Sequence, residues 1–598
     1  MFAPPDMQDS GRPVVTLSLL VNYAAHGLNV WGYRALNIAV HLLAGLTLYG
    51  VVRRTLVSEV LVERFGRASG PIALTVALVW LVHPLQTECI CYTSQRSESL
   101  MGLFYLLTLY CAIRAGTASR RWPWLVAAVS ACTLGMASKE AMVTAPLAVV
   151  LCDWAFRARP FSQVIRRRWA LYAALAGAWV VLAGLMATAP RAQSVGFGLG
   201  VSSLDYALSQ CEMIITYLRL AIWPYPLALD YGEPQPRTIG ELLPYVIGVV
   251  VLLAACAVAW WRWPRIGFAG VWFFLILGPT SSFVPIATEV GAERRMYLPL
   301  ASVVVLAVMG AYELLQRLEQ QRSAKQRTTR RETAAARVPR GLAMSLIGLT
   351  VIALGATTIV RNRDYRSGEA IWKTVIRARP ENGRGHSGLA NVLLKQGRPL
   401  DALPHYETAL RLRPRHYETI SNLGLALGRL NRYEEAVAQH QRAVEIKQDD
   451  PRLRARLALT FGRMGQLDES VREFEETLRQ DPSLTEARVN FVATLMQLAR
   501  VDEAIGHCRQ VLREDQSHVL ARANLGLLLM RHGAWDEAIE HLRFAAGQTG
   551  NPDLFFELGR AFEMAGRPGE ALSQYQQVLR LAPGHDQAKQ RLKALRGR

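Results

Sequence analysis

The chain has 598 residues, of which 51% are hydrophobic and 19% charged, and its formal net charge is +20. This length predicts at least two domains. A strong positive charge is typical of nucleic-acid binding, but here much of the arginine lies in short loops between apolar runs, as in membrane proteins, so we expect no nucleic-acid partner. The eight cysteines form no CxxC pair and no cluster with histidine at zinc spacing, so neither a disulfide framework nor a structural metal is expected.

Residues 1–360 are predicted to form a polytopic helical membrane domain. A helix needs about 20 mostly apolar residues to cross a bilayer. The candidate segments are residues 34–53, 71–90, 98–113, 122–137, 141–156, 169–188, 244–262, 267–287, 297–315 and 341–360. We therefore expect an all-α fold with about 10–11 membrane helices in this domain.

Basic clusters lie between alternate segments. They comprise Arg53 and Arg54, Arg114, Arg120 and Arg121, Arg157, Arg159 and Arg166–Arg168, Arg262 and Arg265, and the basic stretch 317–340. Lysine and arginine concentrate in cytoplasmic loops, so we expect these clusters in the cytoplasm. The loops that follow the segments 71–90, 122–137, 169–188, 267–287 and 341–360 are then expected on the outer side.

Residues 206–223 are apolar enough to cross, but the crossing count favours another position. The segment 244–262 must enter from outside if it is to end in the cytoplasm, so 189–243 should stay outside, with 206–223 lying in the membrane interface or re-entering. Glu212 and Arg219 within 206–223 favour a helix at the membrane surface. An ordinary span with an inverted loop is the alternative.

The amino terminus presents a similar choice. Since the first segment ends at an inside cluster, the residues before Arg34 should lie outside. Either the start of a longer chain is missing, or residues 14–30 are themselves a short span.

The last third of the chain predicts tandem helical repeats. A small residue that begins the second helix of a hairpin recurs at Ala402, Ala436, Ser470, Ala504, Ala538 and Ala571, at intervals of 34 or 33 residues. This period is typical of the tetratricopeptide repeat. We predict a linker with a half-repeat at 361–382 and six repeats at 383–598, forming a superhelix. By the crossing count, the repeats lie outside the cytoplasm.

Two kinds of position should pack the repeats together. Small residues such as Gly424 and Gly526 are expected where paired helices touch, and the large Tyr406, Phe474 and Tyr575 should fill the gap to the next repeat. The concave groove of such a stack suits an extended polypeptide partner. A generic scaffold, whose groove residues are only solvated, is the alternative.

Polar residues gather at the outer ends of the predicted spans. They are His83, Glu88, Arg96, Lys139, Glu140, Asp230, Glu293, Arg294, Arg295 and Tyr297. Because an ionisable group at membrane depth costs about 3 kcal/mol, such placement indicates a function. Carboxylates and cations that converge from four loops suggest a site for an anionic, lipid-borne substrate.

Roles follow from the chemistry of these groups. Glu88, Glu140 and His83 are the candidate catalytic residues, since a carboxylate or imidazole can accept the proton of an attacking hydroxyl. Arg294 and Arg295 can hold a phosphate through paired hydrogen bonds. The remaining candidate substrate-binding residues are Lys139, Arg96, Glu293, Tyr297 and Asp230.

Each group also has a structural interpretation. His83 precedes a proline and can simply end a helix, and Glu88 can form an interfacial ion pair with Arg96. Lys139 can extend to the lipid headgroups, and 293–295 can be a solvated turn. There is no Gly-rich phosphate loop, HExxH or GxSxG motif, so we expect no cofactor and no nucleotide, metalloprotease or serine-hydrolase chemistry.

These residues lie within longer blocks. The blocks are RPVVTLSLLVNY (12–23), HPLQTE (83–88), SQRSE (94–98), GMASKEAMVTAPL (135–147), WPYPLALDY (223–231), PTSSFVPI with AERRMYLP (279–299), and the repeats. In this order they resemble the transmembrane and tetratricopeptide-repeat O-mannosyltransferases and their bacterial relatives, which have the C-type glycosyltransferase fold. The resemblance covers nearly all of the chain.

The resemblance implies a polyprenyl-phosphate-linked sugar as donor and transfer to Ser/Thr hydroxyls of a polypeptide outside the cytoplasm. Arg294, Arg295 and Lys139 would stabilise the charge that develops on the leaving phosphate. Family members also carry an acidic pair in their first external loop, which supplies the expected general base. Asp6 and Asp9 lack the family's spacing, so the base is not assigned to them. Either the chain starts late or this copy is catalytically impaired.

The main hypothesis is therefore a glycosyltransferase embedded in the lipid bilayer of an inner or plasma membrane, with its repeats on the non-cytoplasmic side. The alternative is a non-catalytic scaffold whose repeats assemble an envelope protein complex. A lipid-sugar flippase would require polar residues through the middle of the bilayer, and the sequence has few of them.

Overall fold

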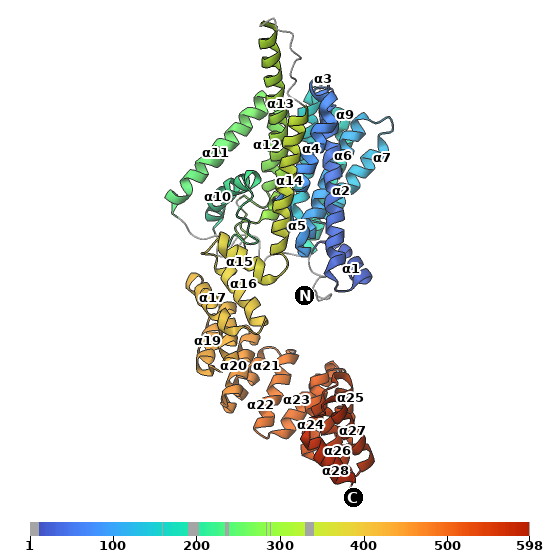
Figure 1. Ribbon diagram of the computed structural model, residues 1–598, viewed down its shortest axis with the longest axis vertical. Helices are drawn as coiled ribbons and strands as arrows, with labels where there is room; N and C mark the ends of the chain where they lie inside the picture. Colours follow the sequence, from blue (N-terminus) through green and yellow to red (C-terminus); the bar gives the residue numbers. More distant parts are fainter. Residues whose placement is uncertain are drawn as a thin grey trace. The chain divides into compact units, whose positions relative to one another are not determined.

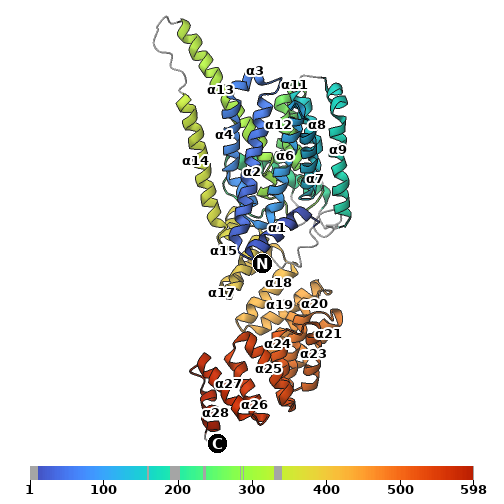
Figure 2. The ribbon, with the colours of Figure 1, turned by 90° about the vertical axis from the view of Figure 1, so that its right-hand side faces the viewer.

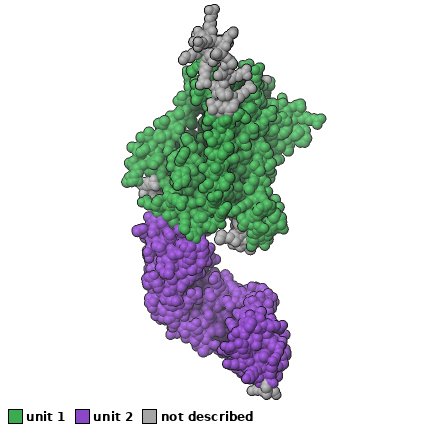
Figure 3. Space-filling model, viewed as in Figure 1, with its two compact units in different colours: residues 1–385 green, residues 386–598 purple. Residues whose placement is uncertain are grey.

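The computed structural model describes residues 11–157, 160–188, 202–233, 238–282, 284–286, 289–328 and 340–596, without the side chains of 322–343. Two compact units, residues 1–385 and 386–598, are coloured separately in Figure 3. Every element in the described ranges is a helix, as the sequence predicts. Asp6 and Asp9 lie outside these ranges.

Figure 1 shows the first unit as a bundle of helices. Its elements are α1 (Pro13–His26), α2 (Val30–Leu56), α3 (Val62–Phe65), η2 (Gly66–Ala68), α4 (Ser69–Leu81), η3 (Pro84–Gln86), α5 (Thr87–Cys91), η4 (Thr93–Gln95), α6 (Arg96–Thr117), α7 (Trp122–Met136), η5 (Glu140–Thr144), α8 (Ala145–Phe156), α9 (Phe161–Thr188), α10 (Ser203–Ile222), α11 (Ile239–Arg262), α12 (Pro264–Leu277), η6 (Glu293–Met296), α13 (Pro299–Thr328), α14 (Arg340–Asp364) and α15 (Gly368–Ala378).

The described chain contains six helical segments long and apolar enough to cross a membrane. They are Val30–Leu56, Thr93–Thr117, Phe161–Thr188, Ile239–Arg262, Pro299–Gln321 and Met344–Asp364. A bent pair, Val62–Leu81 with Pro84–Cys91, gives a seventh if it is counted as one span. The chain is therefore a multi-pass membrane protein. Each of the ten predicted segments overlaps a helix, but the helices at 122–137, 141–156 and 267–287 are too short to cross alone.

Two predicted segments end early, and prolines explain both. The segment 71–90 is broken by a bend of 56° between Leu81 and Pro84, because proline has no N–H for the helical ladder. The segment 267–287 stops being helical at Leu277. Gly278 still has helical dihedral angles, but Pro279 has no N–H to continue the helical ladder.

The helices alternate in direction, so the basic loops and the polar loops lie at opposite ends of this unit. At one end, near α3, the guanidinium of Arg54 lies over the ring of Tyr110 and that of Arg114 lies over Trp124. Figures 1 and 2 show α1 and α15 at the other end. We call this second end, formed by α1, α5, η5 and η6, the polar end.

α10 lies along the polar end and does not cross the bundle. At its start, the hydroxyl of Tyr206 donates to the carbonyl oxygen of Thr280 at 2.9 Å. At its last turn, the carbonyl oxygen of Ala221 is 3.1 Å from Nε2 of His83. Since both partners belong to the polar end, α10 lies along that end of the bundle.

α1 also lies at the polar end (Figure 2). Its 14 residues extend about 21 Å at 1.5 Å per residue, which is less than the hydrocarbon thickness of a bilayer. The backbone N–H of Val14 donates to the carbonyl oxygen of Ala137 at 3.4 Å, so α1 packs against the turn after α7. α1 is therefore not the short span considered for residues 14–30.

The second unit consists of helical hairpins. Its elements, beginning with a helix that straddles the unit boundary, are α16 (Gly383–Lys395), α17 (Pro399–Leu412), α18 (Tyr417–Arg429), α19 (Tyr433–Ile446), α20 (Pro451–Met464), α21 (Leu467–Gln480), α22 (Thr485–Gln497), α23 (Val501–Glu514), α24 (Val519–His532), α25 (Trp535–Thr549), α26 (Pro552–Met564), α27 (Pro568–Leu581) and α28 (Asp586–Arg596). The six small residues at the predicted 34- or 33-residue intervals are all fully buried. The predicted repeat architecture is confirmed.

The large residues pack in two ways. Phe474 stacks on Phe491 of the next repeat with ring centroids 5.4 Å apart, as predicted. Tyr575 instead packs within its own repeat, since a Cβ at Gly559 would lie 2.6 Å from its ring. The small residue of the first helix thus makes room for the large residue of the second.

Gly526→Ala should destabilise the repeats. Its Cβ would lie 2.6 Å from Cγ of the fully buried Leu542, and overpacking of this kind costs about 1–3 kcal/mol. Gly506→Ala is the matched control, because nothing lies within 4 Å of that added Cβ and alanine favours a helix. The melting temperature of the repeats is measured for both variants by heating the protein and monitoring proteolytic cleavage within residues 386–598. Equal melting temperatures would contradict this packing.

Candidate active site

A cluster of charged side chains lies at the polar end, between α1, α6 and the turn after α7. Lys139 forms an ion pair with Glu98. Arg12 Nη2 is 3.2 Å from Glu140 Oε2, and Arg12 Nη1 donates to the hydroxyl of Ser97 at 3.2 Å. The side chains of Arg12 and Glu140 are 26% and 32% exposed, so this part of the cluster is accessible to a ligand.

Helix ends bring these residues together. Pro13 begins α1, where its missing N–H costs nothing, and Arg12 precedes it. Lys139 and Glu140 follow the end of α7, and Glu98 lies in the first turn of α6, where the helix dipole favours a carboxylate. Three loops far apart in sequence therefore meet at one place.

Arg294 in η6 connects two carboxylates. Its Nη1 donates to Glu88 Oε1 at 2.6 Å, and its backbone N–H donates to Glu88 Oε2 at 2.8 Å. Its Nη2 pairs with Glu289. Burial alone would raise the pKa of Glu289, but the charges of Arg294 and Arg295 outweigh it and lower that pKa. Both carboxylates therefore hold Arg294 in position.

Arg294 also lies within electrostatic range of the first cluster. Burial lowers the pKa of Lys139; the Glu98 charge raises it, and the positive charges of Arg12 and Arg294 lower it again. Arg12 Nε is buried and has no hydrogen-bond partner within the described ranges. Three cations thus gather around a partly open site, and among the described residues one N–H of Arg12 has no acceptor.

Arg295 is engaged by the protein itself. Its Nη1 donates to the carbonyl oxygen of Thr280 at 2.9 Å and to Gln210 Oε1 at 3.2 Å. Its Nη2 donates to Glu289 Oε1 at 3.2 Å. The side chain is 2% exposed, so its contacts anchor the loop before η6 to α10.

Glu293 is fully buried beside a cation from the end of α14. Its Oε1 accepts hydrogen bonds from the backbone N–H of Ala228 at 2.5 Å and from the Tyr231 hydroxyl at 3.3 Å. Its Oε2 is 3.5 Å from Arg361 Nη2. Burial raises the pKa of Glu293 to about 7, although the Arg361 charge opposes that rise.

This raised pKa predicts a pH-dependent stability. The folded state binds the Glu293 proton more tightly than the unfolded state, so the contribution is complete below pH 4.5 and is lost as pH rises through about 7. The free energy of unfolding should fall by about 3 kcal/mol over this interval. Melting temperatures in detergent at pH 5 and pH 8 test this. Glu293→Gln should remove most of the slope, and an unchanged slope in that variant would contradict the assignment.

Asp230 holds the chain that follows α10. Its Oδ1 accepts from the backbone N–H of Gly232 at 2.7 Å and from Asn382 Nδ2 at 3.2 Å. Its Oδ2 is 3.1 Å from Arg384 Nη2. These contacts lead away from the charged cluster and toward the end of the first unit.

His83 makes the contacts of a helix cap. Its Nδ1 accepts from the backbone N–H of Leu85 at 3.2 Å, so its Nε2 carries the proton that reaches Ala221. Tyr297 is fully buried, and its hydroxyl lies 2.9 Å from Nδ1 of His41. Both side chains are thus bound by protein groups.

Arg96 does not pair with Glu88. It is fully buried; its Nε donates to Asn37 Oδ1 at 2.8 Å and its Nη2 to the carbonyl oxygen of Tyr33 at 3.0 Å. Its Nη1 donates to the carbonyl oxygen of Ser18 at 3.0 Å. Glu88 lies in α5, which ends at Cys91, and the extended Tyr92 separates it from Arg96 at the start of α6, so the interfacial ion pair considered for them is wrong. Arg96 instead joins α1, α2 and α6.

Sequence reasoning missed four charged residues around these groups. They are Arg12, Glu98, Glu289 and Arg361. Glu98 is the first residue of the predicted span 98–113, where a carboxylate at membrane depth is costly enough to be a signal. The other three lie just outside the predicted segments and carry no local pattern that separates them from solvated charges.

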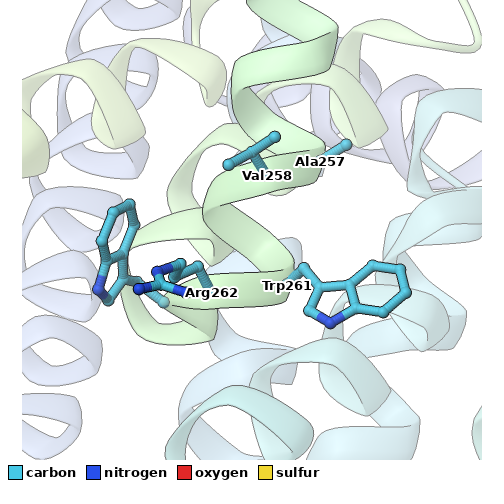
Figure 4. Close-up of a pocket in the computed structure, with 5 residues that line it drawn as sticks. Ala257, Val258, Trp261 and Arg262 are labelled. Atoms are coloured by element: carbon cyan, nitrogen blue, oxygen red, sulfur yellow. The ribbon is translucent and has the colours of Figure 1, made fainter.

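A pocket of about 720 Å³ lies elsewhere, at the end of α11 (Figure 4). Ala257, Val258, Trp261, Arg262 and Trp263 line it. These residues belong to the basic end, and the Trp261 side chain is 90% exposed. Aromatic and basic residues of this kind are typical of the membrane interface, so the pocket is separate from the charged site.

Family models and known proteins match parts of this chain. Models of the tetratricopeptide repeat match residues 383–449 and residues 356–403, 456–519, 489–552 and 523–586. Mouse (Mus musculus) protein O-mannosyl-transferase TMTC2 is 31% identical over 142 residues, 23% of this chain and 15% of that protein. Human (Homo sapiens) protein O-mannosyl-transferase TMTC1 is 23% identical over 454 residues, 66% of this chain and 47% of that protein.

The second unit holds only residues 386–598, so a match over 454 residues includes the first unit as well. The chain matches the TMTC family of protein O-mannosyl-transferases. It spans about half the length of human TMTC1 and a smaller share of mouse TMTC2. The TMTC resemblance drawn from the sequence blocks is confirmed.

Solved structures resemble parts of the chain. YrrB, described as a TPR protein with an unusual peptide-binding site, is 19% identical with a TM-score of 0.28, covering 31% of this chain and 97% of that chain. TTC0263, a thermophilic TPR protein from Thermus thermophilus, is 21% identical with a TM-score of 0.26, covering 30% of this chain and 98% of that chain.

Proposed function

We propose that the protein is a membrane glycosyltransferase that moves a sugar from a polyprenyl-phosphate donor to Ser/Thr hydroxyls of a polypeptide. The observation that carries this proposal is the gathering of Arg12, Lys139 and Arg294 at one partly open site, with carboxylates beside them. Preplaced cations suit a phosphate. The names of the similar proteins support mannose as the sugar.

The chemistry assigns different roles to the charged groups. The bond between the anomeric carbon and the phosphate oxygen breaks, and the anomeric carbon bonds to the acceptor oxygen. Arg12, Lys139 and Arg294 stabilise the negative charge on the departing polyprenyl phosphate. The acceptor hydroxyl gives its proton to a carboxylate. We assign this role to Glu140, which is partly exposed, whereas Glu88 is fully buried against Arg294.

The proposal includes an orientation and a division of labour. The positive-inside rule favours an orientation with the basic end in the cytoplasm and the polar end outside. Residues 1–360 then form the transferase domain, 361–382 the linker and half-repeat, and 383–598 the six repeats that bind the acceptor outside the cytoplasm.

A ladder of amides on the first helices of the repeats supports a polypeptide acceptor. Asn422 Nδ2 donates to Asn391 Oδ1 at 3.0 Å, and Arg456 Nη1 donates to Asn422 Oδ1 at 3.0 Å. Asn490 and Asn524 follow Arg456 at the same position of the next two repeats. Amide side chains both donate and accept, so they suit the backbone of an extended peptide.

Donor binding tests the site directly. Polyprenyl monophosphate is titrated into the protein in nanodiscs and followed by native mass spectrometry. Lys139→Gln should weaken binding by about tenfold or more, because it removes a charge-assisted contact with the phosphate. Arg265→Gln, at the basic end, should leave binding unchanged. The reverse pattern would place the donor at the wrong end and contradict the proposal.

A further inference from the structure

The segment that leads from α14 into the repeats contacts the loop that carries Arg294. We call this loop, residues 289–297, the site loop. Arg361 reaches Glu293, and its Nη1 donates to Asp364 Oδ2 at 3.2 Å and to Thr374 Oγ1 at 3.3 Å. The last turn of α14, α15 and the buried carboxylate next to Arg294 are therefore joined through one guanidinium. Arg361 is only 5% exposed, so little solvent screens these contacts.

The same segment makes a second set of contacts. Asn382 Nδ2 donates to the carbonyl oxygen of Asp230 at 3.0 Å, and Arg384 pairs with its carboxylate. Arg379 Nη1 donates to Glu212 Oε1 at 3.3 Å, and its guanidinium lies 5.6 Å from the ring centroid of Tyr231. These contacts fix the chain after α10 to the start of the repeats.

Residues 230–232 in turn hold the site loop. The backbone N–H of Val290 donates to the carbonyl oxygen of Gly232 at 2.9 Å, and the Tyr231 hydroxyl donates to Glu293 Oε1. η6 has only four residues and too few internal hydrogen bonds to fix its own position. Its placement therefore depends on these neighbours.

We propose that Arg361 and Asn382 are positioning residues that set the place of Arg294, so that the half-repeat is part of the transferase site and not only a tether. This inference rests on the proposed function, because the positioned group is the donor-phosphate cation. Arg361 holds the site loop at Glu293, and Asn382 holds it through residues 230–232. Neither residue touches the donor.

Displacement of Arg294 should affect the transfer reaction as well as the fold. If Arg294 is displaced, the protein still binds the donor through Arg12 and Lys139. Arg294 then no longer contacts the phosphate on which negative charge develops. A misplacement of about 1 Å can cost about 100-fold in rate. Loss of either positioning residue should therefore lower kcat much more than it raises KM for the donor.

The test uses the full-length protein in nanodiscs, with hydrogen–deuterium exchange of residues 289–297 and transfer kinetics as parallel readouts. Asn382→Ala removes no charge and is the principal variant; Arg361→Gln is the second, and Arg361→Lys should recover part of the rate. Arg377→Gln, on the exposed face of α15, is the matched control. We expect exchange at 289–297 to rise at least about tenfold in Asn382→Ala and Arg361→Gln but not in the control, with kcat falling about 10- to 100-fold at nearly constant KM.

Unchanged exchange at 289–297 in both variants would overturn the inference, as would a loss of activity expressed only in KM. The exchange readout does not need the reaction. If the wild-type protein transfers no sugar, the proposed function fails while the positioning of η6 is still judged by exchange.

Discussion

Arg294→Gln should abolish sugar transfer and destabilise the first unit. Glu88 is fully buried, and both of its oxygens accept from Arg294, so the variant leaves a buried carboxylate without its cation. Breaking a buried pair from one side costs about 3–5 kcal/mol. Loss of a preplaced charge at the leaving group should lower the transfer rate by about 100-fold or more. Thermal unfolding and initial rates measure the two effects.

A double variant separates stability from catalysis. Glu88→Gln together with Arg294→Gln removes both charges of this pair, so no carboxylate is left there without its cation, and most of the lost stability should return while activity does not. Recovery of activity in the double variant would show that Arg294 acts only on the fold. Arg294→Lys should retain some activity, because it keeps the charge but loses the forked geometry.

Glu140→Gln should lower transfer by about 100- to 10,000-fold with little change in stability. The variant removes a proton acceptor of the kind that contributes this much to hydroxyl activation, and its pair with Arg12 is exposed enough to add little stability. Donor binding should remain, because the three cations are untouched. Initial rates at saturating donor measure the loss.

Glu241→Gln is the matched control for this substitution. Glu241 is an exposed carboxylate in the first turn of α11, outside the charged cluster, so its variant should transfer at the wild-type rate. If Glu140→Gln retains more than about a tenth of the rate, another carboxylate accepts the proton, and Glu98 beside Lys139 is the next to replace.

The helical class, the membrane segments and the repeats could be predicted because each leaves a periodic or compositional signal. Runs of about 20 apolar residues marked spans, and a 34-residue period marked the hairpins. The distribution of arginine indicated that 206–223 lies at one end of the bundle. These signals are local or regularly spaced, so a single sequence contains them.

The pairings within the site could not be predicted. Glu88 and Arg294 are 206 residues apart, and Arg12 and Glu140 are 128 apart. Nothing in the local pattern of a charge says which distant charge it meets. Proximity in sequence was misleading for Arg96, which lies eight residues after Glu88 but contacts α1 and α2, because the helix that carries Glu88 ends at Cys91 and Arg96 begins the next long helix.

Transfer by the natural full-length protein in proteoliposomes tests the central claim most directly. Radiolabelled polyprenyl-phosphate mannose and a Ser/Thr peptide library are supplied on the side of the polar end. We predict that the peptide becomes labelled and that β-elimination releases the label. Arg294→Gln should abolish this labelling and Glu241→Gln should retain it. Folded protein that transfers no sugar from any polyprenyl-phosphate donor, on either side of the membrane, would contradict the account.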